Sequence, residues 1–280
     1  MIRPTPTPPD PVAPPDPVAP PAPRDAVQRW RLVVARDAMT ADGGQREQLA
    51  AWEAALVGSG LPIAGLDAPK PRPRFAQGAP LAASIPGEQE LADVWLVERV
   101  PQWRAREALL PVMPDGFRLV DLYDVWLGEA ALPGRVVASV YRATMAGPAV
   151  ELGLVRAAVR SLLDATVLPR ERRKGDAVVA YDLRAFIDGI EVEGIPEDAP
   201  EGAPGDVVVR MVLRHDPEKG IGRPEELLAC LGDVLAAPLV VTGLVRERLV
   251  LADPAPPPPG PRQPTRTRQP SSRRSPSSPR

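Results

Sequence analysis

Two periods of apolar residues run along the middle of the chain and predict its secondary structure. In residues 206–214 (DVVVRMVLR) the alternate residues 207, 209, 211 and 213 are all apolar and share one face, which is typical of a strand with a buried face. In residues 149–163 apolar side chains recur at three- and four-residue spacing, which indicates an amphipathic helix. The same criteria predict strands at 29–35, 91–100, 117–127, 135–142, 166–169, 177–183 and 238–251, a short extended piece at 61–66, and helices at 45–57, 102–110 and 224–231.

The predicted elements repeat in the order β-α-β-β-α-β, once in residues 25–132 and, with 166–169 and 177–183 taken together as one strand pair, once in residues 133–253. Each unit has the order of a ferredoxin-like fold, in which two helices cover one face of an antiparallel sheet. We therefore predict an α+β protein made of two tandem ferredoxin-like units, with Pro133-Gly134 at the junction. The two sheets could pack face to face or form one continuous sheet.

Both ends of the chain have a different composition. Residues 1–24 hold 11 of the 39 prolines, and residues 254–280 hold 10 more. Segments of this kind contain too few large apolar groups to offset the entropy lost on ordering, so we expect two disordered tails. The remaining 229 residues are rich in Val, Leu and Ala and are long enough to bury a substantial core.

The net charge of −2 conceals an asymmetry between the core and the C-terminal tail. The tail carries six arginines and no acidic residue, whereas residues 25–253 carry 26 basic and 34 acidic side chains. An acidic body argues against nucleic-acid binding by the whole surface. The basic tail could contact RNA or another polyanion, or could serve as a solubilising extension.

The chain has one cysteine, Cys230, and one histidine, His215. An intrachain disulfide is therefore excluded, which fits a reducing compartment. The proline-rich N-terminus does not resemble a signal peptide. The longest apolar stretch, near 234–245, contains Pro238 and is shorter than the ~20 residues of a membrane span. We expect a cytoplasmic protein that does not associate with a membrane.

Few residues are suited to catalysis or metal binding. His215 follows a strand in the polar sequence HDPEKGIG, where a solvated loop histidine is the simplest interpretation. Cys230 lies toward the end of a predicted helix, where an apolar core role is favoured over a reactive thiolate. Glu191 and Glu193 lie between glycines, as in a solvated turn. One histidine and one cysteine do not make a zinc or iron–sulfur site. We predict no catalytic residue, no metal and no cofactor.

Basic clusters are the best candidates for a binding site. Three basic residues alternate with prolines in residues 69–75 and so could project from one side of an extended segment. Four more crowd the expected turn between two strands near 170–174. These groups could contact phosphate, or could be charges that suppress aggregation at a hairpin tip. The candidates for anion or RNA binding are Lys70, Arg72, Arg74, Arg170, Arg172, Arg173, Lys174, Arg184 and Arg223.

Several short sequences together resemble a known family. In the second half these are LPRERRKG at 168–175, YDLR at 181–184, VRMVLR at 209–214 and GRPEE at 222–226; in the first half they are GLP at 60–62, PRPRF at 71–75 and APL at 79–81. They resemble the radical-SAM-associated family of proteins that contain a domain of unknown function, DUF2344. The resemblance covers essentially residues 25–253 and is more specific in the second half.

The resemblance implies a partner. Members of this family are similar to a module that is encoded beside, or fused to, a radical SAM protein, often near genes for RNA processing. The family's Ser-His-Leu-Asp-like motif is replaced here by Thr40-Ala41-Asp42-Gly43, and its Pro-His-Pro-Arg by Pro71-Arg72-Pro73-Arg74, so both histidines are missing. Three arginines match the family pattern and are the first choices for a shared site: Arg74, Arg184 and Arg223.

Three hypotheses follow for the function. The first is a non-catalytic accessory protein that presents a substrate, RNA among the candidates, to a radical SAM partner. The second is an RNA- or nucleotide-modifying enzyme with an arginine-lined site. The third is an RNA-binding protein that acts through the basic tail and residues 170–174. The missing histidines favour the first hypothesis over the second, and the acidic core weakens the third.

Overall fold

The computed structural model describes residues 24–38, 44–146, 150–174, 177–194, 207–237 and 239–253; both tails lie outside these ranges. The first half contains β1 (Gln28–Arg36), α1 (Gln45–Gly58), β2 (Phe75–Gln77), β3 (Gly87–Leu96), α2 (Gln102–Leu109), η1 (Leu110–Val112) and β4 (Phe117–Asp124). The second half contains α3 (Leu132–Arg135), β5 (Val136–Ala146), α4 (Leu152–Asp164), β6 (Pro169–Lys174), β7 (Ala177–Asp182), η2 (Leu183–Phe186), β8 (Ile187–Glu193), β9 (Val207–Asp216), β10 (Gly220–Ile221), α5 (Pro224–Leu235) and β11 (Val240–Leu251).

The first half is an antiparallel sheet with helices on one face. Its strands lie in the order β2-β3-β1-β4. Alternate residues of β1, among them Leu32, face the helices α1 and α2 and form an apolar core with Trp52 and Leu56 of α1. Burial of this face stabilises the half by roughly 1.5–3 kcal/mol for each large apolar side chain.

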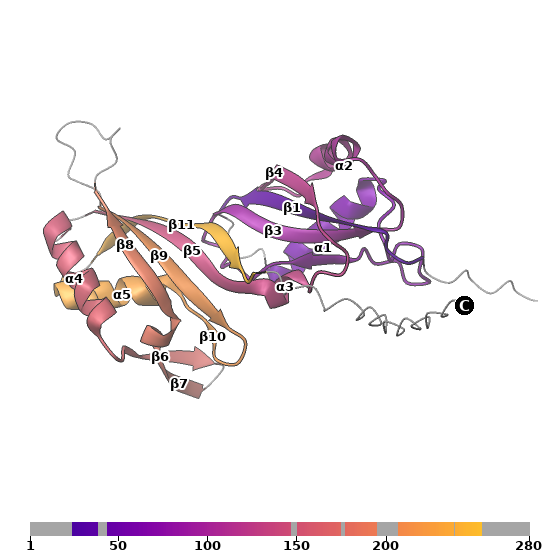
Figure 1. Cartoon of the computed structure of the whole chain (residues 1–280). Helices are drawn as coiled ribbons and strands as arrows, with labels where there is room; N and C mark the ends of the chain where they lie inside the picture. Colours follow the sequence, from indigo (N-terminus) through magenta and orange to yellow (C-terminus); the bar gives the residue numbers. More distant parts are fainter. Residues whose placement is uncertain are drawn as a thin grey trace, which may run out of the picture.

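The second half has the same arrangement. Its strands lie in the order β8-β9-β5-β11, again antiparallel, and α4 and α5 lie together on one side of them (Figure 1). The core joins α4 and α5 to β5 and β9 through residues such as Val155, Leu231, Met145 and Met211. The period-two and helical patterns of the sequence therefore mark the faces that are buried.

The two halves form one continuous sheet. Strand β11 of the second half pairs in parallel with β3 of the first half, with Arg246 opposite Gly87 and Arg248 opposite Gln89. The result is a nine-stranded, mostly antiparallel sheet, which decides between the two arrangements that the sequence left open. No helix in the described part of the chain is both long and apolar enough to cross a membrane.

Three local predictions were wrong. Residues 170–174 belong to strand β6, not to a turn, and β6 pairs with β7 in a separate two-stranded sheet. Glu191 and Glu193 lie in strand β8, not in a turn, because β8 pairs with β9 despite the glycine at position 189. Helix α5 runs past Gly232 to Leu235 and ends at Ala236, which is left-handed with a φ of 49°.

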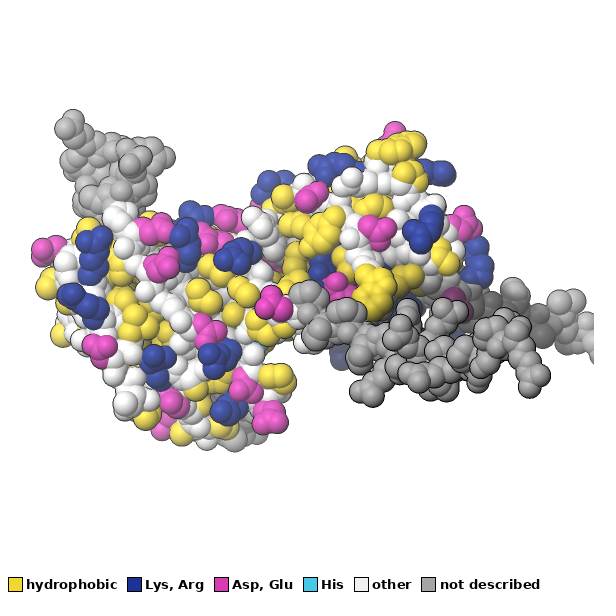
Figure 2. All heavy atoms as spheres, viewed as in Figure 1, with side chains coloured by type: hydrophobic (Ala, Val, Ile, Leu, Met, Phe, Trp, Pro, Cys, Tyr) yellow, Lys and Arg dark blue, Asp and Glu magenta, His cyan; other side chains and the backbone are white. Residues whose placement is uncertain are grey.

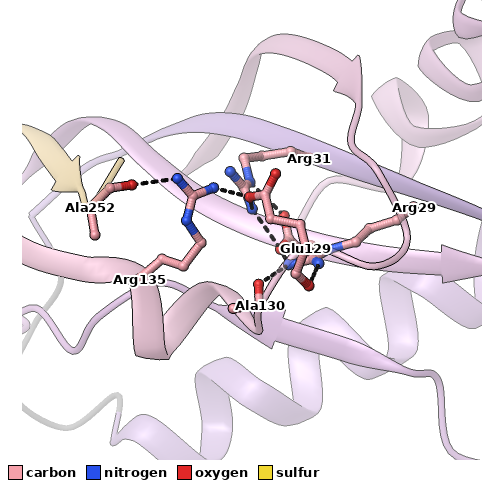
Figure 3. Close-up of polar contacts among 7 residues, drawn as sticks. Arg29, Arg31, Glu129, Ala130, Arg135 and Ala252 are labelled. Carbon is pink, nitrogen blue, oxygen red and sulfur yellow. Dashed lines mark hydrogen bonds and ion pairs between the residues drawn. The ribbon is translucent and has the colours of Figure 1, made fainter. Parts of the chain in front are cut away.

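A buried ion-pair cluster fastens the connection between the halves to the sheet face that lies away from α1 and α2 (Figure 3). Asp93 of β3 accepts hydrogen bonds from both Arg29 and Arg31 of β1, and these three side chains are 0–3% exposed. Arg31 and Arg135 both pair with Glu129 of the connection. We call these five residues the linker cluster. It also receives the end of β11, because Arg135 donates to the carbonyl of Ala252.

Candidate ligand-binding cleft

Residues 79–85 form an irregular segment that two buried arginines hold by its carbonyl groups. Arg246 of β11 donates to the carbonyl oxygens of Ala79 and Pro80 at 3.0 and 2.9 Å. Arg36 of β1 donates to those of Leu81, Ala82 and Ile85. Within the segment the Ile85 amide donates to the carbonyl of Ala82 at 3.1 Å, and the guanidinium groups supply the other donors.

A cleft of about 900 Å³ lies between this segment and the second half. One wall is formed by residues 80–82 and Ile85, and the opposite wall by residues 220–226 at the start of α5. Tyr141 of β5 also lines it. Both halves therefore contribute to the cleft, which we call the interhalf cleft. Its volume lies within the ~300–1,000 Å³ range of small-molecule sites.

A buried polar network lies beside Tyr141. Glu90 of β3 accepts two hydrogen bonds from Arg246, one of them 2.8 Å from Nε. Burial alone would lower the pKa of Arg246, but its hydrogen bonds with Glu90 and the Glu90 charge raise that pKa overall. Burial raises the pKa of Tyr141, which is opposed by the charge of Arg246 and by hydrogen bonds with Arg246 and Ser139.

The single histidine belongs to this network. The prediction of a solvated loop was wrong, because His215 lies in β9 and its Nε2 is 2.9 Å from the Ser139 hydroxyl oxygen. Burial, and then the charge of Arg246, lower the pKa of His215 from 6.5 to about 4. The imidazole is therefore neutral at physiological pH.

The geometry is better suited to binding than to proton transfer. Ser139 and His215 have the spacing of a nucleophile and its base, but Ser139 is 0% exposed and neither residue lines the interhalf cleft. A base with a pKa near 4 is also poorly matched to neutral pH. Among the described residues there is no group of three or more His, Cys, Asp or Glu side chains placed to hold a metal ion.

The predicted basic residues of the first half lie together on the chain but have separate contacts. Lys70 and Arg72 are exposed, and Arg72 pairs with Glu53 of α1 at 2.7 Å. Arg74 places its guanidinium 4.7 Å from the ring centre of Trp95, on which Arg29 also stacks at 4.9 Å. The alternating residues therefore do not form one row of free cations.

The predicted basic residues of the second half are also dispersed. Arg170 joins β6 to α5 through Cys230 and Asp233, and the prediction that Cys230 is buried was confirmed. Arg184 donates to the carbonyls of Leu163 and Ile187. Arg172, Arg173 and Lys174 follow Arg170 in β6, and their side chains lie outside the described part.

The three arginines that match the family pattern do not meet in the interhalf cleft. Arg223 alone of the three lines it, as the exposed residue that precedes α5. No hydrogen bond, ion pair or ring contact joins any two of Arg74, Arg184 and Arg223 in the described residues. On the face shown in Figure 2, basic and acidic side chains are interspersed over both halves without a continuous basic surface.

Sequence reasoning missed Arg36, Arg246, Glu90 and Tyr141. A signal was present for the two arginines. Arg36 has the same strand parity as Leu32 and Val34, and Arg246 the same parity as Leu244, so each puts a charge on an apolar face. A charge in such a position is buried only with partners.

One comparison with known proteins gave a match. A family model described as "Uncharacterized protein conserved in bacteria (DUF2344)" matches residues 32–223, which is more than two thirds of the 280 residues. The match includes Arg36, Glu90, Tyr141 and Arg223, and ends before Arg246. No curated protein matches the chain.

Proposed function

The chain belongs to the DUF2344 family of uncharacterised bacterial proteins, and from this premise we propose that it is a non-catalytic accessory protein. In this proposal it holds a substrate in the interhalf cleft and presents it to a radical SAM partner. The partner supplies the chemistry, and this chain supplies position.

The observation that carries the proposal is the construction of the cleft. It measures about 900 Å³ and takes its walls from both halves. The polar groups beside it, Glu90, Arg246, Tyr141 and Ser139, are hydrogen-bonded to one another. Such a network fixes the shape of a site rather than supplying a free acid or base.

We further propose that the two halves are tandem ferredoxin-like units. The orders β2-β3-β1-β4 and β8-β9-β5-β11 support this, since both are antiparallel and both place the first and third strands at the centre. The hairpin β6–β7 is then an insertion between α4 and β8.

The experiment is affinity capture from the native cytoplasm with the full chain and two variants. Arg223→Glu reverses a charge at the cleft, and Arg104→Glu reverses an exposed charge on α2 as the control. A radical SAM protein is identified among the captured proteins by mass spectrometry. We expect the unchanged chain and the Arg104 variant to capture the radical SAM protein. Substrate is cross-linked to the chain before capture, and we expect Arg223→Glu to lose this cross-linked substrate.

A third variant distinguishes an RNA-binding protein, for which the composition of the C-terminal tail is the supporting observation. Here glutamine replaces all six tail arginines, Arg262, Arg266, Arg268, Arg273, Arg274 and Arg280. Capture of RNA alone, abolished by this variant, would contradict the accessory role and leave RNA binding through the tail. Retention of the radical SAM protein by this variant would support the accessory role.

A further inference from the structure

A second hollow lies on the other side of residues 79–85, within the first half. Its volume is about 190 Å³, smaller than the interhalf cleft. Its walls include Arg36 of β1, Trp52 of α1 and Phe117 of β4. We call it the Arg36 pocket. It is separate from the cleft on which the proposed function rests.

Arg36 differs from the other buried arginines of the described chain. Arg29, Arg31 and Arg246 each pair with a buried or half-buried carboxylate. Arg36 is 4% exposed and has only carbonyl partners. Glu90 also lines the pocket, but both of its carboxylate oxygens are bound by Arg246. Arg36 therefore forms no ion pair of its own among the described residues, although the charge of Glu90 acts on it from nearby.

Two further features of the pocket favour an anion. The Nε–H group of Arg36 and the Nε1–H group of Trp52 are buried and donate no hydrogen bond in the described structure. Burial lowers the pKa of Arg36, and the charge of Glu90 offsets this only in part, so the surroundings of Arg36 disfavour its charge.

The remaining walls define the rest of the ligand. Trp52 and Phe117 pack edge to face with ring centres 5.1 Å apart, and Val34 and Ala92 add apolar surface. A volume below the ~300 Å³ of most ligand sites admits only a small molecule. We propose that the Arg36 pocket binds a small carboxylate with an apolar body, whose carboxylate supplies the counterion of Arg36.

The test compares carboxylates with amides of the same shape. The probes are benzoate, phenylacetate and hexanoate, each beside its neutral primary amide, and binding to the full chain is measured by calorimetry and by ligand-observed NMR. Since charge-assisted hydrogen bonds are about twice as strong as neutral ones, we expect at least one carboxylate to bind about tenfold or more tightly than its amide.

Two variants locate the binding. Arg36→Met removes the charge, and Ala83→Leu fills the pocket while leaving Arg36 in place. Ser84→Leu is the control, since Ser84 is an exposed neighbour that does not line the pocket. We expect the first two to lose binding and the control to keep it. If Arg36→Met does not fold, Ala83→Leu and its control still decide the result.

Three outcomes would overturn the proposal. Equal binding of carboxylates and amides would make the pocket an apolar hollow without anion preference. Failure of every carboxylate to bind would leave Arg36 with the single role of holding residues 79–85. Binding that survives Ala83→Leu would place the ligand elsewhere.

Discussion

Two buried arginine clusters in this protein are built on different principles. In the linker cluster, Arg29, Arg31 and Arg135 each reach a carboxylate, either Asp93 or Glu129. Around residues 79–85, Arg246 has a carboxylate in Glu90, whereas Arg36 has only carbonyl groups. Carboxylates neutralise a buried charge, but carbonyl dipoles only partly replace its hydration.

This difference distinguishes the linker cluster, which stabilises the fold, from Arg36, for which we propose a role in ligand binding. Burial lowers the pKa of Arg31, but its hydrogen bond with Asp93 raises that pKa overall, so its charge is held by the fold. The pKa of Arg36 is lowered by burial, which the charge of Glu90 only partly offsets. The linker cluster joins β1, β3, the connection and Ala252, whereas Arg36 lines a hollow.

The substitution Asp93→Asn tests whether the carboxylates of the linker cluster stabilise the fold. The substitution removes the carboxylate shared by two buried guanidinium groups and leaves Arg29 without a counterion. Removing one partner of a buried ion pair costs about 3–5 kcal/mol, and we expect a loss of this size in the free energy of unfolding. Urea unfolding followed by circular dichroism measures it.

The control for this experiment is Asp115→Asn, at an exposed position between η1 and β4. Surface substitutions of this kind usually change stability by less than about 0.5 kcal/mol. A loss for Asp93→Asn no larger than that of the control would show that the linker cluster does not fasten the halves.

The pH dependence of stability tests the effect of burial, and then of the Arg246 charge, on His215. Its folded pKa of about 4 lies below the ordinary 6.5, so the unfolded state takes up the proton first as pH falls. The stability due to neutral His215 is complete above pH 6.5 and is lost as pH falls toward 4. Between about pH 7.5 and 5 we expect a loss of about 2 kcal/mol from this residue.

His215→Gln isolates this contribution, because the chain has no other histidine. The difference in unfolding free energy between the chain and the variant is measured by urea titration at each pH. A difference that stays constant from about pH 7.5 to 5 would mean that neither burial nor the charge of Arg246 lowers the pKa of His215.

The substitution Arg36→Met tests the same comparison at the buried arginine that has only carbonyl partners. The variant leaves no carboxylate unpaired and removes a buried charge that has no ion pair, although three carbonyl groups lose a hydrogen bond and, in the described part of the chain, only that of Ala82 keeps another donor, the Ile85 amide. We expect a net loss of about 1 kcal/mol in unfolding free energy, since the two effects oppose each other. The matched variant Arg246→Met strands Glu90 and should cost at least twice as much. Equal losses would remove the distinction between the two arginines.

The sequence predicted the elements whose side chains follow one period. Strand β9 and helix α4 were confirmed because Val207, Val209, Met211 and the apolar stripe of residues 152–164 face one core. Strand β8 was missed because its acidic residues and Gly189 are typical of a turn, and only its pairing with β9 makes it a strand.

The sites depend on contacts distant in sequence and were less predictable. Glu90 and Arg246 are 156 positions apart and meet only because β11 pairs with β3. The basic residues that stand out in the sequence mostly contact neighbouring groups of the same chain, as Arg184 donates to the carbonyl of Leu163 near the end of α4. A polar residue on an apolar face, such as Arg36, is a better guide than a run of charges.

The smallest expected effect is that of Arg72→Ala, which extends the comparison to an exposed arginine. Arg72 pairs with Glu53 at 2.7 Å, but its side chain is 68% exposed, so water screens the pair. We expect a loss of about 0.2–1 kcal/mol in unfolding free energy at low salt, which disappears at about 1 M salt, where the Debye length is ~3 Å. The same salt series with Asp93→Asn should leave its loss nearly unchanged, because Asp93 and the two arginines that pair with it are only 0–3% exposed. If the two variants respond alike to salt, burial does not set the strength of the arginine pairs in this protein.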